Sequence, residues 1–254
     1  FSRRIELDNS EDEIHKMAST FNEMLDTVEE VFIHEKQFSS DVSHELRTPI
    51  TVILAQSDYA LQYSDTLEET KESLEVINRH AKRMTNLINQ IMELSKLERQ
   101  KEIEKEKINL SNIVLQLLED YKPLLESKNL NLIYNVEKDI RIQGNKIMLE
   151  RVFLNILMNA VKFTKTNIEV SLTREDKTAV LKIRDNGIGI SEENKKFIWE
   201  RFFQVNDSRN KEENKGSGLG LSMVKKIVDL HSATIDLESE LEQGTCFTIK
   251  FNMQ

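Results

Sequence analysis

One histidine of the chain lies among the residue types that phosphoryl chemistry needs. His44 stands in the stretch FSSDVSHELRTPI, with a carboxylate directly after it and a threonine one helical turn further on. A neutral imidazole nitrogen can attack phosphorus when the other ring proton is held, and a neighbouring carboxylate can hold that proton. Glu45 is adjacent, and Asp41 shares the same helix face. We therefore predict that His44 accepts a phosphoryl group.

A second group of polar residues recurs on one face of a predicted helix. Asn155, Asn159 and Lys162 follow one another at spacings of four and three within NILMNAVKFT. Amide oxygens can ligate a hard divalent cation whose other ligands are waters and phosphates, and an ammonium group can neutralise phosphate oxygens. A solvated polar stripe would give the same spacing, so the pattern alone leaves both interpretations open.

Two glycine-rich stretches follow in the second half of the chain. Asp185-Asn-Gly187-Ile-Gly189 comes directly after the strand-like run AVLKIR, and GSGLG, residues 216–220, opens the helix-like run LSMVKKIVDL. Glycines after a strand let the main chain approach a ligand, and the aspartate can accept the exocyclic amine of adenine. Free donors at a helix start suit a phosphate. A dinucleotide fold would place its glycines after the first strand of a unit, so the motif order argues against that fold.

The composition favours long helices with solvated faces in more than one domain. The 254 residues are 31% charged and 39% hydrophobic, with only 2 prolines and a net charge of -9. An acidic chain does not neutralise nucleic-acid phosphates over a broad surface, which argues against nucleic acid as a partner. The single cysteine, Cys246, lies in an apolar run and is predicted to be a buried structural thiol. The sequence has no run of about 18 apolar residues that would predict a membrane-spanning helix.

Apolar residues at spacings of three and four predict two long helices in the first hundred residues. The first seam loses its phase near Glu35, and Pro49 lies inside the helical pattern that follows. The second helix spans about Leu67 to Arg99. The first seam resumes after its phase break through Phe38, Val42, Leu46, Ile50 and Ile53. A capping box at Ser10 places the start of the first helix near residue 10. Because proline removes a main-chain donor, we expect a bend just below His44. Such helices bury their seams fully only by pairing with a second copy, which predicts a homodimeric four-helix bundle.

Short β-type runs alternate with helices in residues 108–254, which predicts a layered α/β sandwich. Ser111 is the predicted N-cap of its first helix. The charged stretch 101–107 is a plausible hinge before it. The segment 205–218 has no large apolar residue beyond its first position, which is typical of a lid. His231 falls at a predicted helix end, where a partly positive ring would be favoured by the helix dipole.

Taken in order, the motifs resemble those of a known family. SHELRTPI resembles the H-box of sensor histidine kinases, and NILMNAVKFT, DNGIG, WERFFQ, GSGLGLS and QGTCF resemble the N, G1, F, G2 and G3 boxes of their ATP-binding domain, whose fold is shared with gyrase and MutL ATPases. Asp12–Met24 resembles the second helix of a HAMP domain. The implied domains are 1–30 (end of HAMP and signalling helix), 31–100 (dimerisation and histidine phosphotransfer), 101–107 (hinge) and 108–254 (ATP binding).

The resemblance implies a role for each matching residue. His44 would accept phosphate with help from Glu45, and Thr48 would position water for dephosphorylating a response regulator. Asn159 would ligate Mg²⁺, with Asn155 nearby. The implied cofactor-binding residues are Asn155, Asn159, Lys162, Asp185, Gly187, Gly189, Phe203, Gly216, Gly218, Leu219, Gly220 and Thr245.

One departure from the family pattern falls in the lid. Phe202 and Phe203 would anchor the lid, and the family often places an arginine directly after this pair. Here Gln204 stands in that position, so Arg201 or Arg209 is the expected substitute.

The implied function is that of an ATP-dependent protein histidine kinase. It would phosphorylate His44 and transfer the phosphoryl group to an aspartate of a cognate response regulator, which it would also dephosphorylate. The expected cofactors are ATP and Mg²⁺, and the expected partners are a second copy and the regulator. Because the sequence opens on Phe1, we expect a fragment of a longer protein. The resemblance to a HAMP domain implies that it is the cytoplasmic portion of a bacterial membrane sensor whose anchor lies upstream. The alternative is a nucleotide-binding dimeric scaffold that does not transfer phosphate.

Overall fold

The chain folds into two compact units that are described separately. The computed structural model describes residues 4–5, 13–205 and 216–253. The units are Phe1–Asn86 and Leu87–Gln254, so the second helix of the chain contributes to both. The predicted capping box at Ser10, the lid residue Arg209 and most of the predicted lid lie outside the described residues.

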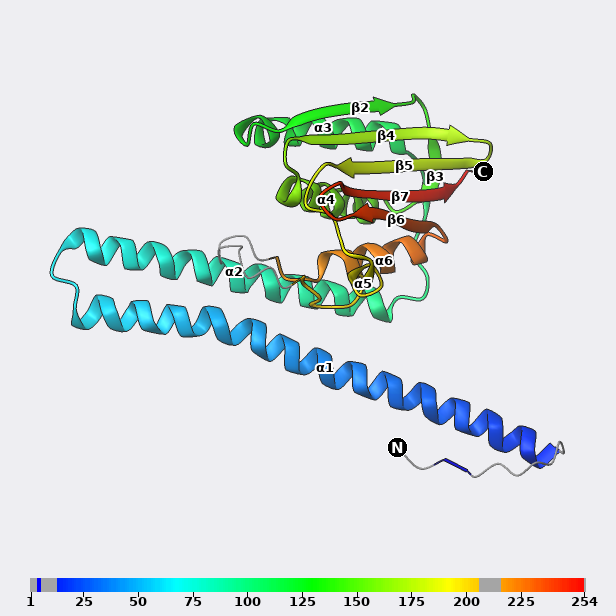
Figure 1. Cartoon of the computed structure of the whole chain (residues 1–254), viewed down its shortest axis with the longest axis horizontal. Coiled ribbons are helices and arrows are strands. Elements are labelled where there is room, and N and C mark those ends of the chain that lie inside the picture. Colours follow the sequence, from blue (N-terminus) through cyan, green and yellow to red (C-terminus); the bar gives the residue numbers. More distant parts are fainter. Residues whose placement is uncertain (1–3, 6–12, 206–215, 254) are drawn as a thin grey trace. The chain divides into compact units, whose positions relative to one another are not determined.

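A helical hairpin dominates the first unit, as the apolar spacing predicts (Figure 1). Helix α1 spans Glu13–Gln62 and helix α2 spans Leu67–Arg99. Helix α1 continues through Pro49, which is buried, so the proline does not end the helix. Apolar residues of the first seam remain exposed in the single chain: Ile14, Met17, Phe21, Met24, Val28 and Val31.

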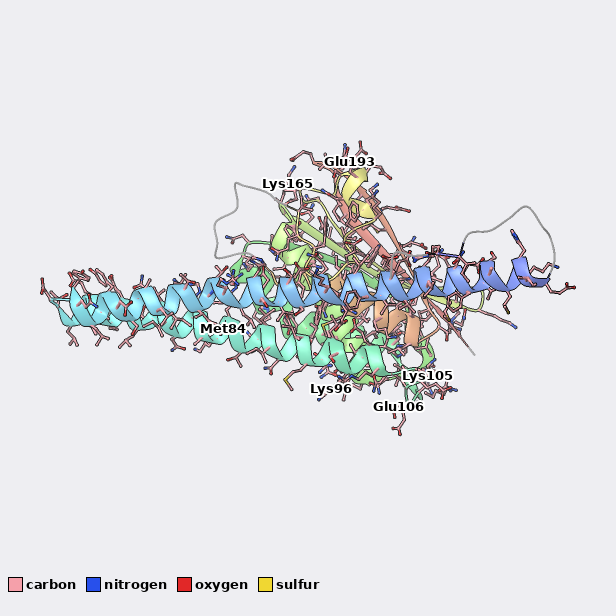
Figure 2. The ribbon with its side chains drawn as sticks, turned by 90° about the horizontal axis from the view of Figure 1, so that it is seen from below. Met84, Lys96, Lys105, Glu106, Lys165 and Glu193 are labelled. Carbon is pink, nitrogen blue, oxygen red and sulfur yellow. The ribbon has the colours of Figure 1, made fainter. Side chains whose placement is uncertain are left out.

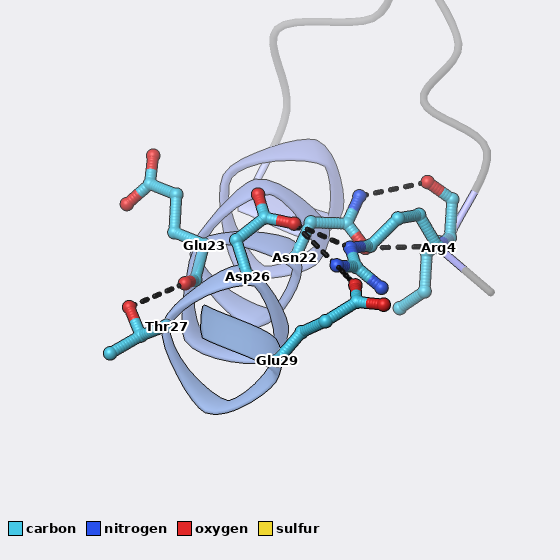
Figure 3. A network of polar contacts seen from close by, with 7 residues as sticks. Arg4, Asn22, Glu23, Asp26, Thr27 and Glu29 are labelled. Carbon is cyan, nitrogen blue, oxygen red and sulfur yellow. Dashed lines mark hydrogen bonds and ion pairs between the residues drawn. The ribbon is translucent and has the colours of Figure 1, made fainter. Parts of the chain in front are cut away.

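The first described residues are fastened to the side of α1 (Figure 3). The Arg4 guanidinium donates to the carboxylates of Asp26 and Glu29, each at 2.6 Å. The Asn22 amide accepts from the Ile5 main-chain nitrogen and donates to its carbonyl oxygen, both at 2.9 Å. These bonds hold Arg4 and Ile5 against the side of α1. Their partners on α1 lie two to four turns after the start of the helix.

The second unit is built on a five-stranded sheet with the order β2-β4-β5-β7-β6 (Figure 1). Strands β2 and β4 run parallel, and every other neighbouring pair is antiparallel. A separate two-stranded ladder joins β1 to β3. The strands are β1 Glu106–Asn109, β2 Asn131–Val136, β3 Arg141–Gly144, β4 Asn167–Glu175, β5 Thr178–Asp185, β6 Thr234–Glu240 and β7 Gly244–Asn252.

One face of the sheet is apolar and is covered by helices, which confirms the predicted α/β sandwich. Val170, Ile183 and Phe247 lie side by side on neighbouring strands, and all three are buried. Ser171 and Lys182 occupy the next position along two of these strands. Apolar and polar side chains therefore alternate between the two faces, as expected for a sheet with one buried face. The helices are α3 Leu110–Ser127, α4 Lys146–Phe163, α5 Glu192–Lys195 and α6 Gly220–Leu230, and α3, α4 and α6 contact the strands or one another.

The connection between α2 and the sheet is short and charged. Figure 2 shows the Lys105 and Glu106 side chains pointing away from the ribbon, and both are exposed. Strand β1 begins at Glu106, inside the stretch 101–107 that the sequence marks as a hinge. Among the described residues, no helix is both long enough and apolar enough to cross a membrane.

Two local predictions from the sequence were wrong. The N-cap of α3 is Asn109, whose side chain accepts from the Asn112 main-chain nitrogen, and not Ser111. The buried Ser111 hydroxyl instead donates to a carbonyl of the loop between β2 and β3. His231 does lie at the end of α6, but burial lowers the pKa of its ring below the usual 6.5, so a partly positive ring is not favoured there.

Candidate functional site

His44 presents its ring on the exposed side of α1. Among the described residues the ring makes no hydrogen bond, while Glu45 beside it is half-buried. The Thr48 hydroxyl lies one turn further on, with its oxygen 3.5 Å from the His44 carbonyl oxygen. Asp41, which the sequence places on the same face, accepts a hydrogen bond from Gln37 at 2.8 Å. The ring that is predicted to accept phosphate is therefore accessible to another molecule.

An open hollow of about 560 Å³ lies beside the ring along the same helix. Lys36 and Arg47 bring two positive charges to it, and three serine hydroxyls lie between them. Cations and hydroxyl donors are suited to phosphate oxygens. The lining residues are Phe32, Glu35, Lys36, Ser39, Ser40, Ser43, His44 and Arg47.

In the second unit, the polar face of α4 meets the start of α6. A β-carbon placed on Gly220 would lie only 2.7 Å from the Asn155 side-chain oxygen. The Asn155 amide nitrogen donates to the Arg151 carbonyl at 2.9 Å, which directs the oxygen toward Gly220. Asn159 is half-exposed and lies one turn further along the same face of α4. Glycine at position 220 therefore lets the GSGLG stretch approach the NILMNAVKFT helix closely.

The start of α6 is open to an anion. Leu219 is the N-cap and provides no side-chain cap, which leaves main-chain donors of the first turn available. The Leu219 side chain is fully buried, so only its main chain can contact a ligand. A β-carbon on Gly216 would lie 3.5 Å from the Lys162 ammonium nitrogen, which brings this cation to the same loop.

The two ends of the predicted lid are held together. The Phe202 main-chain nitrogen donates to the Gly218 carbonyl oxygen at 3.0 Å, across the segment that lies outside the described residues. Phe203 packs its ring against Phe197, with centroids 5.7 Å apart. Arg201, a predicted substitute for the lid arginine, forms a 2.6 Å ion pair with Glu98 at the end of α2.

Asp185 provides a buried carboxylate at the end of β5. Its side chain accepts a hydrogen bond from the Gly187 main-chain nitrogen at 2.8 Å, and the Thr245 main chain donates as well. Burial nevertheless raises the pKa of the Asp185 carboxyl, because desolvation outweighs these two bonds. Thr245 stands directly opposite Asp185 on β7. The structure thus places two predicted cofactor-binding residues side by side.

The glycines after Asp185 allow close packing of main chain. A β-carbon on Gly187 would lie 2.1 Å from the carbonyl oxygen of Phe163, the last residue of α4. One on Gly189 would lie 2.0 Å from the Glu240 carbonyl oxygen at the end of β6. The DNGIG stretch therefore packs between the end of α4 and the turn between β6 and β7.

Two residues that sequence reasoning missed complete this region. The Asn186 side-chain oxygen accepts hydrogen bonds from Thr164, Thr166 and Asn167, and its nitrogen donates to the Thr166 hydroxyl. The Ser239 hydroxyl accepts from the Ile190 main chain and donates to the Gly244 carbonyl. Asn186 lies within the DNG motif, which is a signal that the sequence contains. Ser239 has no signal beyond its place in a strand.

Replacing Gly220 by alanine is expected to weaken ATP binding. The new methyl group would displace the Asn155 side chain, although alanine itself suits a helix start at least as well as glycine. We expect an ATP dissociation constant about tenfold higher, measured by calorimetric titration. Gly216→Ala is the matched variant, because its methyl group meets only the Lys162 ammonium at 3.5 Å. An equal loss in both variants would contradict this account.

Two protein families match the chain in the order that the motifs predict. Residues 34–100 match the His Kinase A (phospho-acceptor) domain. Residues 144–254 match the histidine kinase-, DNA gyrase B-, and HSP90-like ATPase family. A phosphoacceptor hairpin followed by this ATPase fold defines the class of protein. The chain belongs to the bacterial sensor histidine kinases of two-component systems, and its second unit is an ATP-binding domain.

Individual relatives agree with this assignment. The signal transduction histidine-protein kinase ArlS of Staphylococcus aureus is 31% identical over 255 residues, which cover 99% of this chain and 56% of ArlS. The chain therefore spans about half the length of the curated relatives it matches. The solved structure of Acinetobacter baumannii histidine kinase AdeS has a TM-score of 0.65 and 22% identity, and the match covers 83% of this chain and 98% of AdeS.

A second solved structure shares the fold over more of the chain. Histidine kinase ThkA, in complex with response regulator protein TrrA, has a TM-score of 0.73 at 22% identity. The match covers 89% of this chain and 64% of the ThkA chain. At this identity the likeness establishes the fold, which confirms the predicted helical hairpin and ATPase sandwich.

Proposed function

We propose that this chain uses ATP to phosphorylate His44 and then passes the phosphoryl group to an aspartate of a response regulator. The observation that carries the proposal is the convergence of motifs far apart in the sequence. Asn155 of α4 meets Gly220 of α6, and Lys162 approaches Gly216. Asp185 and Thr245 meet on neighbouring strands. This arrangement offers an adenine acceptor at one place and phosphate donors at another.

Each group has a chemical task in this proposal. The Asp185 carboxylate accepts the exocyclic amine of adenine, and the first turn of α6 donates to phosphate oxygens. Lys162 neutralises phosphate charge, and the amide oxygens of Asn155 and Asn159 are the ligands that a hard divalent cation prefers. The described residues contain no cluster of three acidic, histidine or cysteine ligands, so Mg²⁺ would depend on these amides and on the phosphates themselves. A bound Mg²⁺ would neutralise charge that develops on the phosphates during transfer.

Phosphorylation of His44 is a displacement at phosphorus. The lone pair of a neutral ring nitrogen forms the N–P bond while the bond from the γ-phosphorus to the bridging oxygen breaks, and ADP leaves. The second ring proton passes to Glu45, which then carries it as a neutral carboxylic acid. In the second step an aspartate carboxylate of the regulator attacks phosphorus, and the ring nitrogen is the leaving group.

Incubation of the chain with ATP labelled at the γ-phosphate tests this function. The expected product is protein-bound label that is labile in acid and stable in alkali, because it is a phosphoramidate. The alternative scaffold function predicts tight ATP binding with no such label. The accessible His44 ring and its charged hollow favour transfer over binding alone.

We further infer that the chain acts as a homodimer with a response regulator as its partner. The exposed apolar seam of α1 requires a second surface, and the matched phospho-acceptor domain covers most of the hairpin. ThkA has been solved with its response regulator TrrA, which supports a regulator as the partner here. The domain limits 1–30, 31–100, 101–107 and 108–254, with the first as the end of a HAMP domain of a membrane sensor, belong to the same proposal.

Thr48 offers a separate test of a second activity, dephosphorylation of the regulator. Thr48→Ala is expected to abolish dephosphorylation of a phosphorylated partner while leaving autophosphorylation of His44 near its original rate. The reason is that the hydroxyl would orient the attacking water, whereas the ring nitrogen needs no hydroxyl to attack ATP. Thr48→Ser, which retains the hydroxyl, should retain much of the dephosphorylation. Loss of both activities in the alanine variant would argue against separate roles.

A further inference from the structure

His231 joins the end of one helix of the ATP-binding domain to the beginning of another. The buried ring lies at the C-cap of α6. Its Nε2 atom is 3.0 Å from the Asn145 main-chain nitrogen, and its Nδ1 atom is 2.8 Å from the Ile227 carbonyl oxygen. Because the Asn145 N–H can only donate, Nε2 must be the unprotonated acceptor. The proton therefore lies on Nδ1 and is donated to Ile227, which fixes a single neutral tautomer.

This contact lies at the opposite end of the same helix pair from the proposed phosphate site. Asn145 is the N-cap of α4, and Asn155 of the same helix faces Gly220 at the start of α6. The contacts at 145 and 155 are separated by about 15 Å along α4, and those at 220 and 231 by about 16 Å along α6, at 1.5 Å per residue. The helices thus lie antiparallel, and the two contacts are separated by nearly the same distance along each helix.

The surroundings of the ring are shaped to accept it. A β-carbon on Gly144 would lie 3.1 Å from the His231 Cδ2 atom and 2.8 Å from a methyl carbon of Leu149. Gly144 therefore leaves the space that the imidazole occupies. The ring is in contact with the last residue of β3, the N-cap of α4 and the last turn of α6 at once.

We propose that His231 is a positioning residue of the ATP site, because it sets how far α4 and α6 can slide past each other and so keeps Asn155 opposite Gly220. This inference rests on the proposed nucleotide site. A slip by one residue would move one helix by about 1.5 Å. Such a shift would either force the Asn155 side chain into Gly220 or withdraw it from the phosphate loop.

Protonation of the ring would remove this contact. A protonated Nε2 would face the Asn145 N–H with a second donor, so the hydrogen bond would be lost. Desolvation is the main cause that lowers the pKa of His231, the Ile227 carbonyl opposes it, and Lys105 adds a repulsive charge. Leu149 and the main chain of Asn145, which pack against the ring from α4, do not titrate. The pKa of the ring is lowered below the usual 6.5, so the contact is complete above pH 6.5 and is lost only as the pH falls through the lowered pKa.

Two substitutions at His231 each retain one of the two hydrogen bonds of the ring. His231→Gln can place its amide oxygen where Nε2 lies and can still accept from Asn145. His231→Asn can replace Nδ1 as a donor to Ile227 but is too short to reach Asn145. We expect the glutamine variant to bind ATP within about twofold of the unmodified chain and the asparagine variant to bind about tenfold more weakly. Gly144→Ala, which displaces the ring without altering it, should resemble the asparagine variant.

Calorimetric titration of all four chains with ATP and Mg²⁺ between pH 5 and 8 is the test. The ratio of the ATP affinity of the unmodified chain to that of the glutamine chain cancels the titration of ATP itself. It should be constant above pH 6.5 and fall only as the pH drops through the lowered pKa of His231. Equal affinities of the glutamine and asparagine variants, whether high or low, would overturn the inference, as would a ratio that falls above pH 6.5, where the ring is neutral. Binding by the unmodified chain at pH 8 tests the ATP site itself, so failure of the two proposals can be distinguished.

Discussion

Replacing His44 by glutamine is expected to abolish the acid-labile label that the chain acquires from ATP. Glutamine is close to histidine in length and polarity, and the ring is exposed and makes no hydrogen bond among the described residues, so the fold should be unaffected. An amide nitrogen, however, has no available lone pair to attack phosphorus. The measurement is the γ-phosphate label that survives alkali and is released by acid, followed over time in both chains.

The control for this experiment is a histidine of the same hairpin that has no proposed chemical role. His80 lies on α2, and His80→Gln should retain the full rate of labelling. ATP affinity should be the same in all three chains, because the nucleotide site lies in the other unit. Label that persists unchanged in His44→Gln would show that another residue accepts the phosphate and would contradict the proposed function.

Replacing Asp185 by asparagine is expected to weaken ATP binding by at least about tenfold, and to reduce labelling of His44 in proportion at low ATP concentration. The carboxyl oxygens already accept from the main chains of Gly187 and Thr245. The amine of adenine would be a third donor in the same place. An amide retains only one acceptor oxygen for these three donors, and it adds two donors of its own.

An exposed acid of the same sheet provides the matched comparison. Asp236 lies on β6 and is 64% exposed at its side chain, in a loose ion pair with Lys250. Asp236→Asn changes the net charge by the same amount but should leave ATP affinity within about twofold, because exposed pairs contribute little. Calorimetric titration with ATP compares the two. If both variants lost affinity equally, a general effect of charge would explain the result better than recognition of adenine.

Periodicity and motif order were sufficient to predict the architecture. The seams of α1 and α2 gave both helices, because a spacing of three and four has no other simple explanation over so many turns. The glycine motifs predicted where the strand β5 ends and where α6 begins, since each lies at an element boundary. Strands β1 and β3 were missed because four residues are too few to establish an alternating pattern.

The errors share a physical cause, which is contact between residues far apart in the sequence. Ser111 has the residue type of an N-cap, but its hydroxyl is used by a loop 26 residues away. His231 has the position of a charged C-cap, but packing against Gly144 and Asn145 buries it and keeps it neutral. Local propensity cannot anticipate such partners. The same limit applies to Ser239, whose bonds join a strand to the G1 motif.

The hydrogen bonds of Asn186 have a consequence for how the domain opens. One side chain joins the loop after α4, the beginning of β4 and the residue that follows Asp185. Because one amide oxygen accepts from all three donors, displacing the Asn186 side chain breaks these bonds together, so the three segments should open together rather than one at a time. In a hydrogen-exchange experiment, the main-chain amides of the three segments are expected to exchange as a single cooperative unit. The proposed adenine site at Asp185 and the end of α4 that carries Lys162 would then open and close together.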